Sequence, residues 1–170
     1  MITFDKDNEI FYLHTKSTTY AMGVNGGKLF HRYWGKRLVN PLAKTDLSDY
    51  LTRNFEAVDL EGGNSDIVPF EYSTYGNADM RIPSVEFTFA DGSRVSNLTY
   101  KGYEIIDGKP ALEGLPATYC EEGDKGDNLI IHLEDTYQNV YVFLFYSVYE
   151  DLDAITRSTK IVNMGKKIAA

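Results

Sequence analysis

Hydrophobic and polar positions alternate with a period of two along most of this chain. Eight runs rich in β-branched or aromatic residues carry the pattern, and they span residues 9–15, 18–24, 28–33, 84–89, 94–100, 128–134, 139–149 and 154–164. Side chains on a strand point alternately to opposite faces of a sheet, so a period of two indicates strands. The sequence therefore predicts an all-β fold.

Short polar turns separate many of these runs. They lie at residues 25–27, 90–93, 106–109 and 135–138, and the first three contain glycine. Turn residues between two alternating runs are typical of hairpins. We therefore expect an antiparallel β-sandwich in which most strands pair with their neighbours in sequence.

Three segments depart from simple alternation. Residues 140–149 are hydrophobic or aromatic on both faces, which predicts a strand in the middle of a sheet that is covered on both sides. Residues 46–54 carry Leu47, Tyr50 and Leu51 at helical spacing and predict one short helical turn. Residues 58–76 have little periodicity and predict a long loop, which is either a ligand-contacting loop or a plain surface excursion.

Composition and charge then narrow the class of protein. The chain has 170 residues, of which 43% are hydrophobic and 25% charged, and this balance suits one globular domain over residues 1–170. A formal net charge of -8 without a basic cluster disfavours nucleic acid and anionic membranes as partners. The sequence shows no signal peptide and no run of about 18 apolar residues, so we expect a soluble cytoplasmic protein.

Candidate catalytic groups are scarce. Cys120 is the single cysteine and stands beside two glutamates, which disfavours a thiolate nucleophile. His14, His31 and His132 are far apart and lack a second ligand at metal-binding spacing. We therefore expect no metal site and no catalytic residue in this chain.

Aromatic residues are abundant, at 14% of the chain with thirteen tyrosines. Several of them stand beside polar loop residues, among them Trp34, Tyr72, Tyr75 and Tyr119. Aromatic rings stack on the C–H faces of sugars, but they also fill β-sandwich cores. The pattern is open to both interpretations.

Residues 109–119, KPALEGLPATY, have the character of a structural strap. Pro110 and Pro116 restrict the backbone φ angle, and Gly114 permits a turn between them. The neighbouring leucines can anchor the segment to a core. The segment carries no plausible catalytic group.

This strap and four other segments together resemble the N-terminal domain of family 36 glycoside hydrolases, the retaining α-galactosidases. The five segments are YWGK at 33–36, EYSTYGNADMR at 71–81, DGSRVSNLTY at 91–100, KPALEGLPATY at 109–119 and YSVYEDLDAITRS at 146–158. They occur in the order that the family shows. The resemblance covers nearly the whole chain.

The matched residues look structural rather than catalytic. We assign a structural role to Glu71, Tyr72, Gly76, Asp79, Arg81, Gly114, Pro116 and Arg157. Asp79 and Arg81 point the same way on an extended backbone, which predicts an ion pair or a backbone clamp after a bend at Gly76. Arg157 lies in an Ile- and Thr-rich strand and needs an acceptor, such as Glu150 or Asp153.

The resemblance implies a β-supersandwich domain that precedes a (β/α)8 barrel with the catalytic aspartates. It implies release of terminal α-galactose from melibiose- or raffinose-type sugars, without metal or cofactor. This chain would then be an inactive N-terminal portion, truncated after Ala170, that contacts its own barrel. Specificity for α-galactosides or α-N-acetylgalactosaminides would be chosen by the barrel.

The resemblance also implies homo-oligomers in which a loop near residues 51–66 reaches a neighbouring subunit's active site. Arg53 and Phe55 match the family's pattern there, whereas Thr52 replaces its aspartate. Two other functional classes remain open for the chain alone. It can be a stand-alone carbohydrate-binding module or a purely structural assembly domain.

Overall fold

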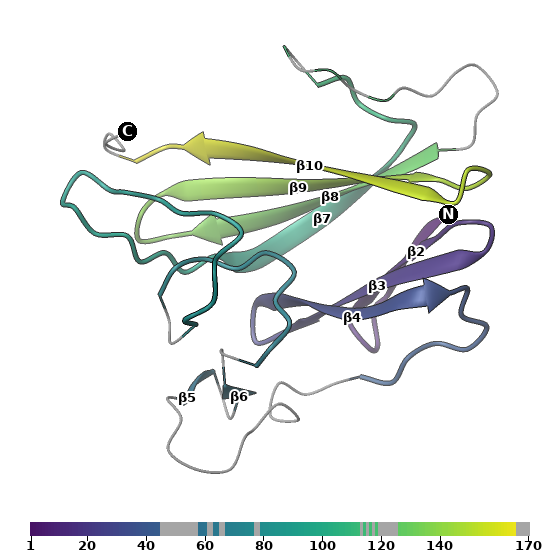
Figure 1. Ribbon diagram of the computed structural model, residues 1–170, viewed down its shortest axis with the longest axis horizontal. Helices are drawn as coiled ribbons and strands as arrows, with labels where there is room; N and C mark the ends of the chain where they lie inside the picture. The colour runs from purple at the N-terminus through teal and green to yellow at the C-terminus, as the bar shows by residue number, and fades with distance from the viewer. Residues whose placement is uncertain are drawn as a thin grey trace.

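The structure is a computed structural model, and it describes residues 1–44, 58–60, 63–64, 67–76, 79–112, 114, 116, 118 and 126–165. Two four-stranded antiparallel sheets dominate this part of the chain and lie one above the other (Figure 1). No helix occurs among the described residues, and residues 46–54, where one turn of helix was predicted, lie outside them. The predicted all-β antiparallel sandwich is confirmed.

The first sheet has the order β1-β2-β3-β4. Its strands are β1 (Ile2–Asp5), β2 (Ile10–His14), β3 (Thr18–Asn25) and β4 (Lys28–Lys36). Gly26 and Gly27 connect β3 to β4 with φ angles of 54° and 72°, which side chains with a Cβ rarely adopt. The hairpin predicted at 25–27 is therefore present, and its two glycines explain why the chain turns there.

The second sheet has the order β10-β9-β8-β7. Its strands are β7 (Thr99–Asp107), β8 (Gly126–Asp135), β9 (Val140–Tyr149) and β10 (Ala154–Asn163). A third, small sheet joins β5 (Val58–Leu60) to β6 (Gly63–Asn64). The ladders between these strands are antiparallel and join sequence neighbours, as the turns predicted.

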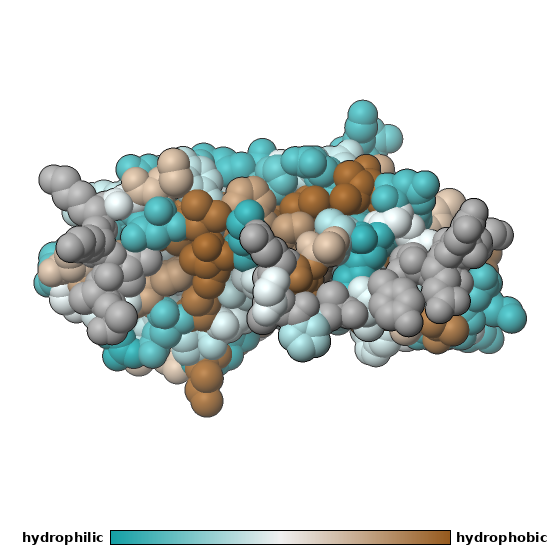
Figure 2. Space-filling view, turned by 90° about the horizontal axis from the view of Figure 1, so that it is seen from above, coloured by the Kyte–Doolittle hydropathy of each residue, from teal (hydrophilic) through white to brown (hydrophobic). Residues whose placement is uncertain are grey.

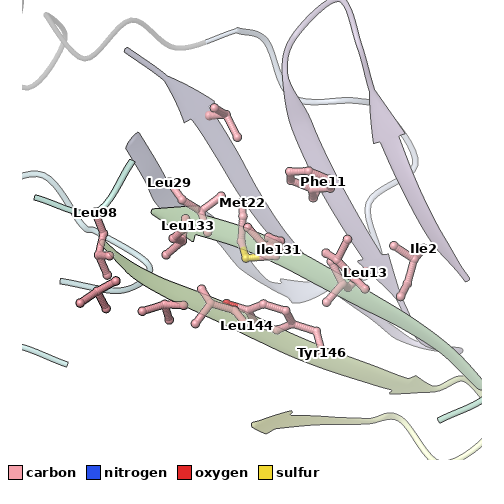
Figure 3. Packing of buried hydrophobic residues seen from close by; sticks show 14 of the residues in the cluster. Ile2, Phe11, Leu13, Met22, Leu29, Leu98, Ile131, Leu133, Leu144 and Tyr146 are labelled. Carbon is pink, nitrogen blue, oxygen red and sulfur yellow. The ribbon is translucent and has the colours of Figure 1, made fainter. Parts of the chain in front are cut away.

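The core lies between the two large sheets, where alternate residues of β2, β3, β8 and β9 face one another (Figure 3). Loop residues Phe87, Phe89 and Leu98 complete it at one end. β9 lies between β8 and β10, as its two hydrophobic faces predicted. Its inward residues are buried, whereas Tyr141, Phe143 and Phe145 on its other face are half-buried.

The outward faces of the two sheets are covered differently. Leu38 and Leu42, from the segment after β4, pack on Ile10, Tyr12 and Ala21 of the first sheet. On the side of the second sheet, Figure 2 shows hydrophobic groups interrupted by hydrophilic ones. The segment after β4 therefore acts as a cover for the first sheet.

Two predicted strands are wrong. Residues 84–89 form no ladder, although their burial still alternates, with Phe87 and Phe89 inside and Glu86 and Thr88 outside. Residues 94–98 are likewise irregular, and β7 begins only at Thr99. Alternation specifies an extended chain that buries one face, but a strand also needs a neighbouring backbone to pair with.

Candidate functional site

The acidic and basic side chains singled out in the sequence form two separate pairs in the structure. Glu71 and Arg157, which are 86 residues apart, form an ion pair at the open side between the sheets. Asp79 and Arg81 form a second pair in the loop before β7. Arg53 and Phe55 lie outside the described residues, so the sugar contact suggested for them stays a prediction.

Glu71 is the centre of a buried polar cluster. The Tyr20 hydroxyl of β3 donates to its Oε2 at 2.5 Å, and the Tyr146 hydroxyl of β9 donates to its Oε1 at 2.8 Å. Arg157 of β10 donates to the same Oε1. Because these donors come from both sheets, one carboxylate ties the two layers and the loop together; we call Tyr20, Glu71, Tyr146 and Arg157 the Glu71 cluster.

The electrostatics of the Glu71 cluster favour neutral tyrosines. Burial raises the pKa of Tyr20 well above its ordinary value, and the adjacent charge of Glu71 raises it further. The pKa of Tyr146 is raised by the same two causes in the same order. Both hydroxyls therefore remain donors to the carboxylate and cannot act as bases near neutral pH.

The predicted acceptors for Arg157 were wrong. Asp153 instead accepts hydrogen bonds from Thr15 and Ser17 in the turn between β2 and β3. Glu150 lies 3.7 Å from the guanidinium of Arg37. Both carboxylates are near Arg157 in sequence, but β10 carries Arg157 away from the β9–β10 turn and toward the loop that holds Glu71.

The predicted clamp at Asp79 and Arg81 is confirmed. Arg81 Nε donates to Asp79 Oδ1 at 2.9 Å, one terminal nitrogen donates to Oδ2 at 2.8 Å, and the same nitrogen also donates to the Val68 carbonyl at 2.8 Å. Burial would raise the pKa of Asp79, but the hydrogen bonds and charge of Arg81 outweigh it and hold the pKa below its ordinary value. The pair joins Arg81 to Asp79 and to the backbone at Val68 within the same loop, and it offers no reactive group.

The remaining motif residues lie apart from both pairs. Tyr72 is half-buried against the main core, and Gly76 adopts a φ of 100° at the predicted bend. Gly114 and Pro116, in the 109–119 strap, are exposed. The residues of the sequence motifs therefore have several separate structural roles and do not form one site.

A cleft opens beside the Glu71 cluster. Its volume is about 330 Å³, and it is lined by Tyr20, His31, Trp34, Tyr146, Ile155 and Arg157. Trp34, at the end of β4, is 55% exposed. We call this hollow the Trp34 cleft. The aromatic content of the sequence pointed to Trp34, but nothing in the sequence indicated that Arg157 would share a cleft with it.

The described residues contain no group of three His, Cys, Asp or Glu side chains that could hold a metal ion. His14 Nδ1 is bonded to the Thr19 hydroxyl, and His132 lies 3.2 Å from Glu104. No helix of this part of the chain has the length and apolar character needed to cross a bilayer.

Comparison with protein families identifies the domain. Residues 27–169 match the model of the glycosyl hydrolase family 36 N-terminal domain. The chain belongs to glycosyl hydrolase family 36. The five sequence segments and the fold therefore have a common explanation.

Individual relatives of this family 36 chain are α-galactosidases. α-Galactosidase Mel36A of Lactobacillus acidophilus is 36% identical over 172 residues, which cover 98% of this chain and 23% of Mel36A. α-Galactosidase AgaA of Geobacillus stearothermophilus is 34% identical and is covered to the same extent, 23%. The chain thus spans about a quarter of the length of these relatives.

Solved structures agree with the sequence relatives. The family 36 α-galactosidase AgaB of G. stearothermophilus superposes with a TM-score of 0.89 at 34% identity, over 97% of this chain and 23% of AgaB. A structure of AgaA in complex with raffinose superposes with a TM-score of 0.82 at 34% identity, over 92% of this chain and 22% of AgaA. The described fold is therefore the N-terminal fold of these enzymes.

Proposed function

We propose that this chain is the non-catalytic N-terminal part of an α-galactosidase that releases terminal α-galactosyl residues from melibiose- or raffinose-type oligosaccharides. The observation that carries the proposal is the match of 98% of the chain to the N-terminal fold of α-galactosidases whose remaining three quarters lie outside it. Its own carboxylates support this division of labour, because Glu71, Asp79 and Asp153 are each occupied by structural donors.

The chemistry requires groups beyond these. A retaining glycosidase needs two carboxyl groups about 5–5.5 Å apart beside the sugar, one of them with a raised pKa. Among the described aspartates with a shifted pKa, namely Asp5, Asp79, Asp91 and Asp153, the direction is downward. Such aspartates stay ionised and are poor general acids, which supports placing the general acid elsewhere in the polypeptide.

Support of a catalytic barrel and contacts between subunits are the roles that we propose for this domain in the complete enzyme. A cytoplasmic location and a homo-oligomer belong to the same proposal. The single cysteine is compatible with a reducing compartment. The choice between galactoside and N-acetylgalactosaminide belongs to residues outside this chain.

Hydrolysis of an aryl α-galactoside tests the proposal. The purified 170-residue chain should release no aryl alcohol above the buffer rate, whereas full-length Mel36A of L. acidophilus serves as the positive control. Joining this chain to the catalytic remainder of a family 36 relative should restore activity. Turnover by the 170-residue chain alone, or an inactive joined protein that is folded, would contradict the assignment.

A further inference from the structure

The Trp34 cleft is a concave site that the structural roles above leave unused. It lies between β3 and β4 of one sheet and β9 and β10 of the other, and it opens to solvent. Its volume of about 330 Å³ falls at the lower end of the range of about 300–1,000 Å³ for small-molecule sites. A hollow of this size fits one or two sugar rings.

Trp34 forms an exposed aromatic wall of the Trp34 cleft. The ring of Tyr20 meets Trp34 edge-on, with centroids 5.6 Å apart and an interplanar angle of 63°. More than half of the Trp34 side chain nevertheless remains in contact with solvent. An indole that is held by a neighbour but left open is suited to stack on the C–H face of a sugar.

The side chains that form the floor of the Trp34 cleft are held in place, because their polar groups already bond to Glu71. Tyr20 and Tyr146 direct their hydroxyls to Glu71, so their ring carbons are what the cleft presents. The guanidinium of Arg157 lies 5.1 Å from the centroid of Tyr146 and is fixed by Glu71. Preorganised walls lower the entropy that a ligand loses on binding.

Donors and charge define the ligand class. Arg157 and His31 bring polar nitrogens to a lining that is otherwise aromatic or aliphatic. The positive charge of Arg157 is balanced by Glu71, and the described residues that line the cleft include no other arginine, no lysine and no acid. A site without excess charge favours a neutral ligand, and an aromatic wall beside polar donors favours one with both a C–H face and hydroxyls.

We propose that the Trp34 cleft binds a neutral hexose unit, with Trp34 stacking on the ring and His31 and Arg157 bonding its hydroxyls. The proposal rests on the proposed function only for the choice of galactosides as probes. It would hold substrate oligosaccharides on the N-terminal domain. The expected affinity is weak, with a Kd on the order of 1–10 mM, because a small polar ligand gains little in an open site.

Trp34 supplies the measurement, because it is the single tryptophan of the chain. Galactose, melibiose and raffinose are titrated into the purified 170-residue chain while the tryptophan emission is followed. We expect a saturable change in intensity and wavelength with each sugar. Emission that stays constant or drifts linearly to high sugar concentration would overturn the proposal.

Variants locate the site, with ligand-observed saturation-transfer NMR as a readout that does not need tryptophan. Trp34→Ala should weaken binding at least about tenfold, because the sugar ring loses the indole on which its C–H face stacks. His31→Phe keeps a ring against Tyr20 and removes only the polar nitrogens, so it should weaken binding about threefold to tenfold. Tyr137→Ala, at an aromatic residue that is 88% exposed and outside the cleft, is the matched control and should bind normally.

Two results would reject the proposed sugar site in the Trp34 cleft. Equal binding by wild type and Trp34→Ala would place the sugar elsewhere. Absent sugar binding, together with a Trp34→Ala variant that changes the oligomeric state in light scattering, would make the cleft a protein contact. Neither result bears on whether the joined enzyme hydrolyses an aryl galactoside, so failure of this site is distinguishable from failure of the proposed function.

Discussion

At the scale of single residues, Glu71 is a carboxylate with a structural role, because its oxygens accept hydrogen bonds that hold the fold together. It is 7% exposed and accepts from two tyrosines and an arginine that come from three different strands. A buried carboxylate with one missing donor would be destabilising, whereas a fully bonded one fixes the relative position of its partners. Glu71 therefore orders the open side of the sandwich and, through Tyr20 and Tyr146, the floor of the Trp34 cleft.

The variant Glu71→Gln tests this role. It keeps the shape of the side chain but removes the negative charge opposite Arg157 and places an amide N–H against donors. We expect a loss of about 2–4 kcal/mol in the free energy of unfolding, measured by urea denaturation, because a half-exposed arginine loses its counter-charge and one hydroxyl loses its acceptor.

Glu104→Gln is the matched control for Glu71→Gln. Glu104 is an exposed glutamate that pairs with His132 on the outside of the second sheet. Its substitution should change stability by less than about 0.5 kcal/mol. Similar effects of the two variants would show that the Glu71 cluster contributes no more than a surface pair.

At the scale of elements, the loop between β6 and β7 is an extended segment that closes the end of the core and meets the first sheet through the isolated bridge between Phe30 and Phe70. Phe87, Phe89 and Leu98 enter the core from it, while Asp79 and Arg81 fix its course. Hydrogen bonds from Ser84 N to Ser73 O and from Phe89 N to Ser93 O replace a strand ladder. The loop is therefore a structural part of the sandwich and not a free excursion.

Gly76→Ala tests the bend that directs this loop. Gly76 has a φ of 100°, and an added Cβ would lie 2.8 Å from a methyl carbon of Val95. Backbone strain and steric overlap together should destabilise the protein by about 2–4 kcal/mol. The measurement is the midpoint of urea unfolding at constant m-value.

Gly92→Ala separates the two causes. Gly92 has a φ of 82°, but its added Cβ would meet nothing within 4 Å. This control should show the backbone strain alone, about 1–2 kcal/mol. If Gly92→Ala lowers the free energy of unfolding as much as Gly76→Ala does, steric overlap with Val95 does not contribute to the destabilisation.

At the scale of the whole molecule, the two sheets share one core and should unfold together. Leu144 of β9 packs in the same buried cluster as Met22 of β3 and Phe11 of β2. Core residues that touch across layers couple the stability of both layers. Loss of packing on one sheet should therefore appear in a probe on the other.

Leu144→Ala tests the coupling, with Trp34 on β4 as the probe of the first sheet. We expect a destabilisation of about 2–5 kcal/mol, with coincident midpoints for tryptophan emission and far-UV circular dichroism. Ile161→Ala, at a residue that is 44% exposed on β10, is the control and should change stability by less than about 1 kcal/mol. Separate midpoints for the two probes would mean that the sheets unfold independently.

Much of the fold was predictable from local pattern. Runs such as 18–24 and 139–149 became β3 and β9 because alternation and turn glycines act within a few residues. Residues 84–89 show the limit of that information. Their alternation correctly predicted one buried and one exposed face, but among the described residues their pairing amounts to one isolated bridge, between Thr74 and Val85.

The sequence by itself determined the strand class, the antiparallel neighbours, the family and the structural character of the matched residues. Only the tertiary structure decided that Arg157 pairs with Glu71 rather than with Glu150 or Asp153, and that Trp34 shares a cleft with both sheets. The physical reason is distance along the chain. Turns and alternation arise from neighbouring residues, whereas an ion pair across 86 residues depends on how the strands pair and how the two layers pack.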